Sequence, residues 1–210
     1  MLLIDKPTGM TSFAVIQLLR KRLGVQKIGH AGTLDPLASG LLLVAVGDET
    51  KEIQQYVGLP KTYEVEMLIG ERRTTGDMEG EVVEERDVPS IDKAKALAVA
   101  SGMIGAMSLP VPTYSAVKLG GEPLYKKARR GEAVKAPLKN MEIYALEIHE
   151  VHCEGGRCIV SASMEVSSGS YVRSIVEEFG KRLGYPATTK ELRRTKIGNF
   201  DVKNAQIPIV

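Results

Sequence analysis

A glycine-rich segment, residues 29–40 (GHAGTLDPLASG), carries the strongest candidate for chemistry in the sequence, the carboxylate of Asp35. Glycine and proline concentrated in so short a segment specify an unusual backbone path, and rigid loops of this kind often hold functional groups. Asp35 precedes Pro36, which biases its backbone toward extended geometry and keeps its carboxylate at a defined place. An isolated Asp-Pro pair more often caps a turn, so the rest of the chain must decide between a structural and a catalytic aspartate.

The segments on either side of this loop are expected to anchor it. A short apolar strand opens the chain, and a helix follows that is capped by Thr11 or Ser12 and ends near Gly24. Residues 41–46 (LLLVAV) form a continuous apolar run, which is typical of a strand inside a sheet. The helix carries apolar residues at helical spacing: Phe13, Ile16, Leu19 and Leu23.

Strands and helices then follow without the regular alternation of a doubly wound sheet, so the predicted class is α+β. We expect a single domain over residues 1–210. A final helix should run over residues 171–183, with one apolar face and Gly184 behind it. The other predicted elements are strands at 63–69 and 81–84, a helix at 91–104, a basic helical stretch within 110–139, and a hairpin over 141–166 that turns at Gly155-Gly156.

Composition excludes a disordered chain and a membrane helix. The 210 residues are 43% hydrophobic and 26% charged, and no apolar run approaches membrane-spanning length. The N-terminus lacks the pattern of a secretory leader, so the cytoplasm is the expected compartment. Cys153 and Cys158 flank the predicted hairpin tip and are interpreted as a structural thiol pair. A zinc site with His149 and His152 is disfavoured because the spacing matches no standard ligand pattern, and no metal is expected.

The net charge of +2 says little about partners, but the charge is unevenly distributed. Residues 118–139 hold seven basic side chains and two acidic ones, and smaller basic groups occur at residues 20–27 and 181–196. Gathered on one face, these groups would form a footprint for RNA phosphates. Basic runs are equally often solvated helix faces, so both interpretations stay open on composition alone.

Several long motifs, in order along the chain, are similar to those of the TruB family of bacterial tRNA pseudouridine synthases. The resemblance spans nearly the entire chain. The motifs are KPTGMTS (6–12), GHAGTLDPLASGLL (29–42), KTYEVEMLIG (61–70), PTYSAVKLGGEPLYKKARRG (112–131), SSGSYVRSI (167–175) and LRRTKIGNF (192–200).

This resemblance implies the pseudouridine synthase fold, a mixed and largely antiparallel central sheet flanked by helices. It also implies isomerisation of the T-loop uridine of tRNA, conventionally position 55, by detaching the base, turning it and rejoining it through carbon. The implied partner is the T arm of tRNA, and no cofactor is required, since an aspartate can form a covalent intermediate unaided. We expect the chain to act as a monomer. Whether the aspartate attacks the base or the sugar stays open.

Three residues match the family's catalytic positions. Asp35 matches the nucleophile, Arg173 the arginine that pairs with it, and Tyr63 the tyrosine that stacks on the target uracil and is a candidate base for the final proton removal. An arginine in the first turn of a helix is poorly placed against the helix dipole, which an anionic partner would resolve. Without the family, a solvent-facing arginine and a core tyrosine are the alternatives.

Further positions match the pocket and the RNA-contacting element. Tyr171 and Leu192 match pocket-lining residues, His30 a histidine near the flipped nucleotide, and Lys6 the pocket floor. A mobile basic insertion at about 110–140 matches the element that closes over the RNA loop. Its candidate phosphate contacts are Lys118, Lys126, Lys127, Arg129 and Arg130.

Other functions remain possible at this point. A guide-RNA-dependent synthase of the dyskerin type and a non-catalytic tRNA-binding or folding protein share the motifs in part, and a glycosidase-like hydrolase would need a second carboxylate. Family members usually continue into a small C-terminal RNA-binding domain, whereas this sequence ends at residues 207–210 (IPIV). We therefore expect a catalytic domain without that RNA-binding domain, and its RNA affinity is in doubt.

Overall fold

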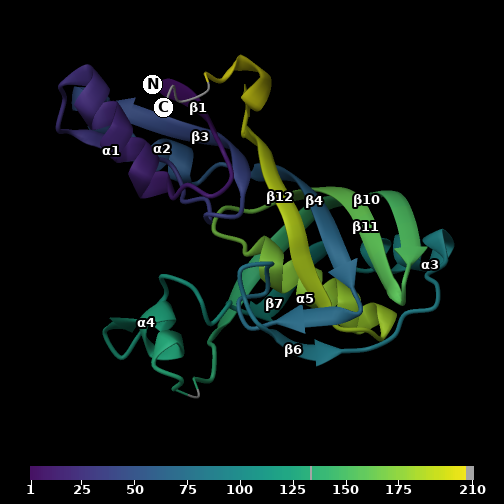
Figure 1. The fold of residues 1–210 in the computed structure, drawn as a ribbon. Coiled ribbons are helices and arrows are strands. Elements are labelled where there is room, and N and C mark those ends of the chain that lie inside the picture. Colours follow the sequence, from purple (N-terminus) through teal and green to yellow (C-terminus); the bar gives the residue numbers. More distant parts are fainter. Residues whose placement is uncertain (133, 207–210) are drawn as a thin grey trace. The chain divides into compact units, whose positions relative to one another are not determined.

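Three long strands, β4 (Lys61–Ile69), β11 (Arg157–Val166) and β12 (Ala187–Ile197), run through the computed structural model, which describes residues 1–132 and 134–206 (Figure 1). The chain divides into two compact units, and each of the three strands contributes to both. Unit 1 comprises Met1–Val65, Ser163–Gly169 and the chain from Glu191 onward, and unit 2 comprises Glu66–Ala162 and Ser170–Lys190. That the chain acts as one domain stays a prediction.

Unit 1 is built around β3. Strands β1 and β2 pair with β3 antiparallel, β12 pairs with it parallel, and β13 pairs with β12. Its remaining elements, in chain order, are β1 (Leu2–Lys6), α1 (Ser12–Leu23), β2 (Ile28–His30), β3 (Ser39–Val46), the 3-10 helix η1 (Gly47–Lys51), α2 (Gln54–Val57), β13 (Phe200–Asp201) and the 3-10 helix η2 (Val202–Asn204).

Strand β3 is buried on both faces. Leu42 and Val44 pack against α1, whereas Leu41 and Leu43 pack on the opposite side with Ile197 of β12. A strand covered on both faces needs apolar side chains at consecutive positions rather than at alternate ones. The predicted interior strand is therefore confirmed, and it provides a rigid end point for the loop that carries Asp35.

Helix α1 begins and ends as predicted but presents a different face. Thr11 caps it by accepting a hydrogen bond from the Ala14 amide (3.0 Å), and Gly24 ends it in the left-handed conformation (φ 66°). Phe13, however, is 62% exposed. The buried face of α1 begins at a polar residue, which the spacing of apolar residues alone could not indicate. This face consists of Ser12, Val15, Ile16 and Leu19.

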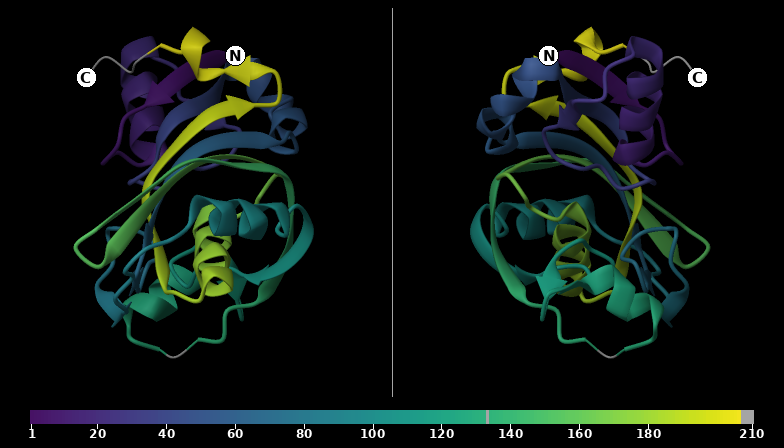
Figure 2. Two further views of the ribbon diagram at one scale, coloured as in Figure 1. Left: turned by 90° about the vertical axis from the view of Figure 1, so that its right-hand side faces the viewer. Right: turned by 90° about the vertical axis from the view of Figure 1, so that its left-hand side faces the viewer.

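Unit 2 contains the strand order β12-β4-β11-β10-β7, in which β10 and β7 are antiparallel. Helix α5 packs against α3 and β7, and Figure 2 shows α5 on the inner side of the curved strands. The predicted α+β class, with a largely antiparallel sheet flanked by helices, is confirmed. The remaining elements are β5 (Glu71–Arg73), β6 (Val82–Glu85), α3 (Lys93–Ser101), β7 (Gly105–Pro110), β8 (Lys118–Leu119), β9 (Glu122–Pro123), α4 (Leu124–Arg129), β10 (Leu138–Glu154) and α5 (Val172–Leu183).

The hairpin between β10 and β11 turns at Gly155 and Gly156, which both have positive φ (57° and 75°). Cys153 and Cys158 form a disulfide across it, in agreement with the predicted thiol pair. Within the described residues, no cluster of His, Cys, Asp and Glu is suited to hold a metal ion. None of the described helices is both long and apolar enough to span a bilayer.

Two predicted helices are shorter in the structure, and several strands, among them β7 and the long strand β12, were not predicted. The helix expected over 91–104 spans Lys93–Ser101, and the basic stretch is helical only in α4. Strand β12 was missed because its polar sequence, ATTKELRRTKI, lacks an apolar alternation. Its burial comes from partner strands that are distant in sequence.

Candidate active site

The loop that carries Asp35 is held on both sides of the aspartate. Ahead of it, Ser12 Oγ donates to the carbonyl of Leu34 (3.1 Å) and accepts from the amide of Leu34 (2.8 Å). Behind it, the carbonyl of Pro36 accepts from the Gly9 amide (2.8 Å), and the carbonyl of Asp35 itself accepts from a turn amide (3.1 Å). The half-buried carboxylate of Asp35 therefore projects from a backbone with little freedom.

Lys6 is fully buried and supports the same loop. Its Nζ donates to the carbonyls of Pro7 (2.8 Å), Met10 (2.6 Å) and Pro36 (3.4 Å). Carbonyl oxygens at these distances solvate the ammonium in place of water. Lys6 therefore supports the loop, and its place at the floor of a substrate pocket stays a prediction.

Arg194 of β12 binds both ends of the glycine-rich loop. It is 1% exposed, and its guanidinium donates to the carbonyls of Leu41 (2.7 Å) and Gly32 (3.1 Å). Gly40 lies so close to Arg194 that a Cβ on it would come within 2.2 Å of the Arg194 carbonyl oxygen, and its φ is 102°. Arg194 therefore cannot belong to the basic footprint that the sequence suggested for residues 181–196, and Arg193 beside it pairs with Asp5 (2.7 Å).

We predict that Ser12→Ala destabilises unit 1 by about 1–3 kcal/mol, because the amide and carbonyl of Leu34 both lose their partner in a buried setting. Urea unfolding followed by circular dichroism measures the change. Thr11→Ala, which removes only the exposed helix cap, is the matched control and should cost about 1 kcal/mol. Equal stability of Ser12→Ala and the parent chain would show that the hydroxyl does not fix the loop.

Three further predicted site residues belong to unit 1. Tyr63 lies in β4 and is 8% exposed, and Leu192 lies half-buried in β12. His30 ends β2, where burial and the nearby Arg194 guanidinium lower the pKa of its imidazole, which is therefore neutral at pH 7. Its Nδ1 is buried and has no hydrogen-bond partner among residues 1–132 and 134–206.

Arg173 lies in the first turn of α5, in unit 2, and is 6% exposed, which excludes the solvent-facing alternative. Its guanidinium donates to the carbonyls of Thr75 (2.7 Å) and Tyr114 (3.2 Å) and lies 3.6 Å from the carboxylate of Asp77. Asp77 is an acidic partner that the sequence did not reveal, because nothing local distinguishes it from other turn aspartates. Pairing of Arg173 with Asp35 stays a prediction.

Tyr171 directly precedes α5 and is half-buried. The ammonium of Lys139 lies 5.3 Å from the centroid of its ring, within the range of a cation–π interaction. The ring is thus flanked by positive charge, which suits a residue near an RNA phosphate or base.

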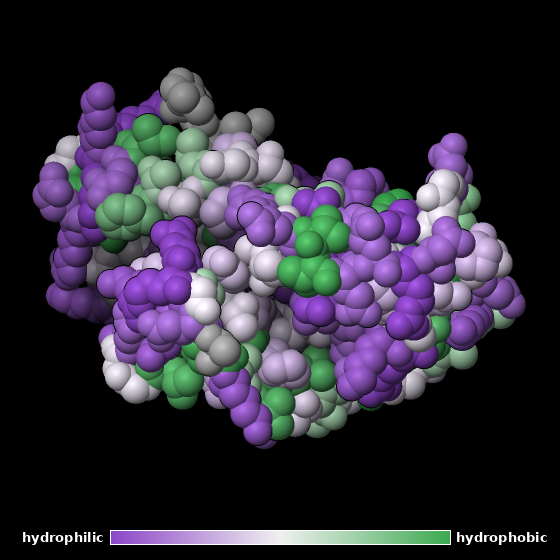
Figure 3. All heavy atoms as spheres, turned by 60° about the horizontal axis from the view of Figure 1, so that its bottom comes forward, coloured by the Kyte–Doolittle hydropathy of each residue, from purple (hydrophilic) through white to green (hydrophobic). Residues whose placement is uncertain are grey.

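The basic insertion lies between β7 and β10, and Figure 1 shows α4 away from the strands of unit 2. Two of its five candidate residues are already paired: Arg130 forms a bidentate ion pair with Glu122 (both 2.7 Å) and also contacts Glu132, and Lys127 lies near the same two carboxylates. Lys118, Lys126 and Arg129 are exposed and form no ion pair with any described residue. Figure 3 shows hydrophilic side chains predominating around α4.

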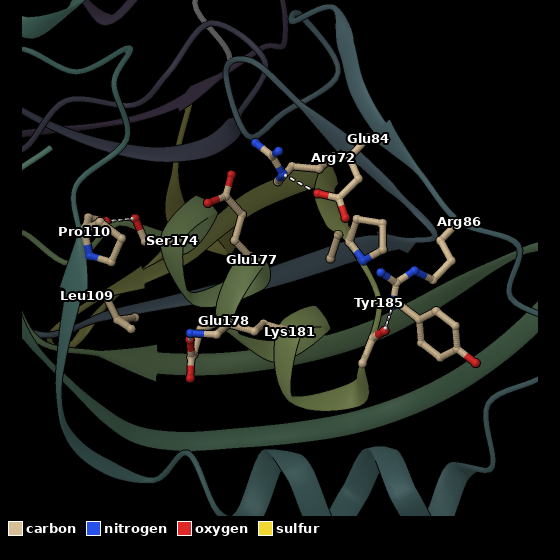
Figure 4. Close-up of a pocket in the computed structure, with 13 residues that line it drawn as sticks. Arg72, Glu84, Arg86, Leu109, Pro110, Ser174, Glu177, Glu178, Lys181 and Tyr185 are labelled. Carbon is tan, nitrogen blue, oxygen red and sulfur yellow. Dashed lines mark hydrogen bonds and ion pairs between the residues drawn. The ribbon is translucent and has the colours of Figure 1, made fainter. Parts of the chain in front are cut away.

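A cavity of about 490 Å³ lies in unit 2 beside α5 (Figure 4). Burial raises the pKa of Glu177, which lines it, and Arg72 and Glu84 form an ion pair at its edge (3.1 Å). None of the predicted site residues lines this cavity. It is therefore not the candidate active site.

The chain is similar to known proteins in sequence. A model described as "TruB family pseudouridylate synthase (N terminal domain)" matches residues 20–172, a range that includes Asp35 and Tyr63 and ends one residue before Arg173. The chain is similar to tRNA pseudouridine synthase B of Pseudomonas putida (43% identity, 95% of this chain and 64% of the relative) and of Xylella fastidiosa (40% identity, 96% and 65%).

Solved structures are similar to the chain in fold. A crystal structure of a Cbf5-Nop10-Gar1 complex matches with a TM-score of 0.74 and 28% identity, covering 98% of this chain and 51% of that one. An H/ACA RNP bound to a substrate RNA containing 2′-deoxyuridine matches with a TM-score of 0.71 and 27% identity, covering 98% and 50%.

The fold is thus the pseudouridine synthase fold. The chain belongs to the TruB family of pseudouridylate synthases and matches its N-terminal domain. It spans slightly less than two thirds of the length of the curated relatives that it matches.

Proposed function

We propose that this chain is a stand-alone tRNA pseudouridine synthase that isomerises the T-loop uridine at position 55, acting as a cytoplasmic monomer on the T arm of tRNA. The observation that carries the proposal is the Asp35 loop: a half-buried carboxylate whose neighbours are fixed on both sides, in a chain 43% identical to a tRNA pseudouridine synthase B. Such fixation is what nucleophilic catalysis requires, because a misplaced nucleophile loses most of its effective concentration.

In this proposal the target uridine leaves its stack and binds to the predicted site residues. Asp35 is the nucleophile, Arg173 offsets the desolvation of its carboxylate, and the ring of Tyr63 supports the uracil. His30, Tyr171 and Leu192 line the nucleotide pocket. The neutral imidazole and buried Nδ1 of His30 support its role, because a neutral ring can donate to or accept from a base or ribose.

The observation behind the guide-RNA-dependent alternative is the likeness in fold to a Cbf5-Nop10-Gar1 complex and to an H/ACA RNP. The sequence identity to those structures is lower than to the tRNA enzymes, 28% and 27% against 43% and 40%. The stand-alone enzyme is therefore the better-supported proposal.

The test is incubation of the purified chain with an unmodified tRNA transcript, followed by mapping of modified uridines and by product analysis. We expect pseudouridine at the T-loop position with no added guide RNA and no change in RNA mass. Free uracil would indicate a hydrolase. Modification that appears only when a guide RNA is supplied would establish the alternative.

The insertion yields a second prediction, on affinity. Lys126→Ala and Arg129→Ala should each weaken binding of the transcript and reduce the slope of log K against log salt by about one. Each change removes a cation that is proposed to contact one RNA phosphate and that forms no ion pair with a described carboxylate. Arg130→Ala is the matched control, because Glu122 and Glu132 already neutralise this guanidinium. Fluorescence anisotropy at several salt concentrations measures the slopes, and a larger effect for Arg130 than for Arg129 would contradict the assignment.

A further inference from the structure

Lys61 holds a buried ammonium that has no part in the proposed reaction. Lys61 is the first residue of β4 and is 5% exposed. The strand alternates strictly, so Lys61 and Tyr63 project from the same face at adjacent positions, with Thr62 between them on the other face. A charged side chain therefore sits next to the proposed uracil-stacking ring, on the buried side of the strand.

The surroundings of Lys61 offer three acceptors. Its Nζ donates to the carbonyls of Val57 (2.6 Å) and Leu59 (2.7 Å) and to Ser168 Oγ (3.1 Å), and the Ser168 hydroxyl donates in turn to the Val57 carbonyl. An ammonium has three N–H donors, whereas a neutral amine has two and a lone pair. The site therefore matches the protonated form, and loss of the proton would leave one buried acceptor without its donor.

These contacts connect the start of β4 to two other segments. Val57 and Leu59 lie at the end of α2 and just beyond it, and Ser168 follows β11. One ammonium thus joins three segments of unit 1 at a point two residues from Tyr63. Besides the pairing of β4 with its neighbouring strands, Thr195 Oγ1 donates to the Thr62 carbonyl (3.3 Å).

The charges that face Lys61 are few. The guanidinium of Arg194 approaches from β12. The α2–β4 connection (57–60) and residues 167–169 carry no charge. No carboxylate of the described chain forms an ion pair with Lys61 or Arg194. Burial first, and the Arg194 charge second, lower the pKa of Lys61 to about 8.

We propose that protonated Lys61 is a positioning residue for Tyr63: its ammonium fixes the start of β4, and its loss of a proton releases the ring from the geometry that supports the substrate uracil. The inference rests on the proposed function, because it assigns a role in catalysis to Tyr63. It does not make Lys61 a catalytic residue, since Lys61 is held away from solvent by its three acceptors.

The stability of the fold should move in the opposite direction from activity. The pKa of Lys61 is lower in the folded chain than in the unfolded chain, so between about pH 8 and 10.5 the unfolded chain binds more protons at this residue. The contribution of Lys61 to the free energy of unfolding therefore increases with pH over this range. Activity should decline over the same range. A merely structural lysine would not produce activity that falls while its own contribution to stability rises.

The experiment follows single-turnover rates on the tRNA transcript from pH 6 to 10 for the parent chain, Lys61→Met and Lys61→Arg, with thermal unfolding at each pH. The parent rate should fall above about pH 8, Lys61→Met should be slowed about 10–100-fold at pH 7 and lack this fall, and Lys61→Arg should stay active to higher pH than the parent. A parental rate in Lys61→Met, or the same alkaline fall in all three chains, would overturn the proposal.

A measurement on the parent without RNA covers the case in which the variants do not fold. The NMR signals of the Tyr63 ring should shift with the same midpoint, near pH 8, as those of the Lys61 side chain. If the Tyr63 ring signals do not change over the pH range in which Lys61 titrates, the proposed coupling between Lys61 and Tyr63 is refuted, even if the enzyme is active. An inactive parent whose ring follows the lysine would instead refute the proposed function and leave the coupling intact.

Discussion

Replacing Asp35 with asparagine is expected to lower the turnover of a tRNA transcript by on the order of 10⁴-fold or more, with RNA affinity unchanged within about threefold. An amide oxygen is a poor nucleophile and cannot form the covalent intermediate. The hydrogen bonds that fix the loop are made by Ser12 and by the backbone of residues 9, 34 and 36. Because these bonds do not use the carboxylate of residue 35, the loop should keep its conformation in the variant.

Single-turnover kinetics with excess enzyme, together with anisotropy binding, separate these two effects. Asp48→Asn is the matched control, since it makes the same chemical change at an aspartate of unit 1 whose side chain is 89% exposed. It should leave both rate and affinity at the parental level. An Asp35→Asn chain that turns over at more than a tenth of the parental rate would remove the nucleophile from the mechanism.

Arg173→Lys is expected to slow turnover by about 10²–10³-fold with little loss of RNA binding, because a lysine keeps the charge but not the planar fork of the guanidinium. Arg173→Ala should be slower still and also less stable, by about 3 kcal/mol, since it leaves the carboxylate of Asp77 buried without this cation. The lysine variant therefore tests catalysis, and the alanine variant measures the structural part of the role.

Arg182→Lys is the control for Arg173, because it makes the same change on the same helix at a partly exposed residue paired with Glu178 (2.9 Å). Its rate should match that of the parent. If Arg173→Lys and Arg173→Ala both retain parental turnover after correction for the folded fraction, Arg173 serves only to hold the turn at Thr75 and Asp77 to α5.

Much of the framework was predictable because its signals are local. Burial at consecutive positions of β3, the cap at Thr11 and the glycine that ends α1 follow from residues close in sequence. The same holds for α5, where the apolar face and Gly184 coincide with the observed helix. The Asp35 loop stood out for the same reason, since its glycines and proline constrain the backbone whatever surrounds it.

The supports of the candidate site were not predictable, because they depend on contacts between distant segments. Arg194 appears in a basic run, yet β12 buries it against the carbonyls of Gly32 and Leu41. Asp77 acquires its importance only from Arg173, nearly a hundred residues away. Lys61 is the exception, since the alternation of β4 already places it on the face of Tyr63, a signal that sequence reasoning could have used.

We propose that Asp35, Arg173 and Tyr63 act together on one pyrimidine. A crystal structure of this chain bound to a T-arm stem-loop would test this proposal. We expect an everted uridine with its base against the Tyr63 ring, the Asp35 carboxylate at the reacting nucleotide and the Arg173 guanidinium paired with that carboxylate. A bound RNA whose T-loop uridine stays stacked, or lies beyond reach of these three side chains, would contradict it.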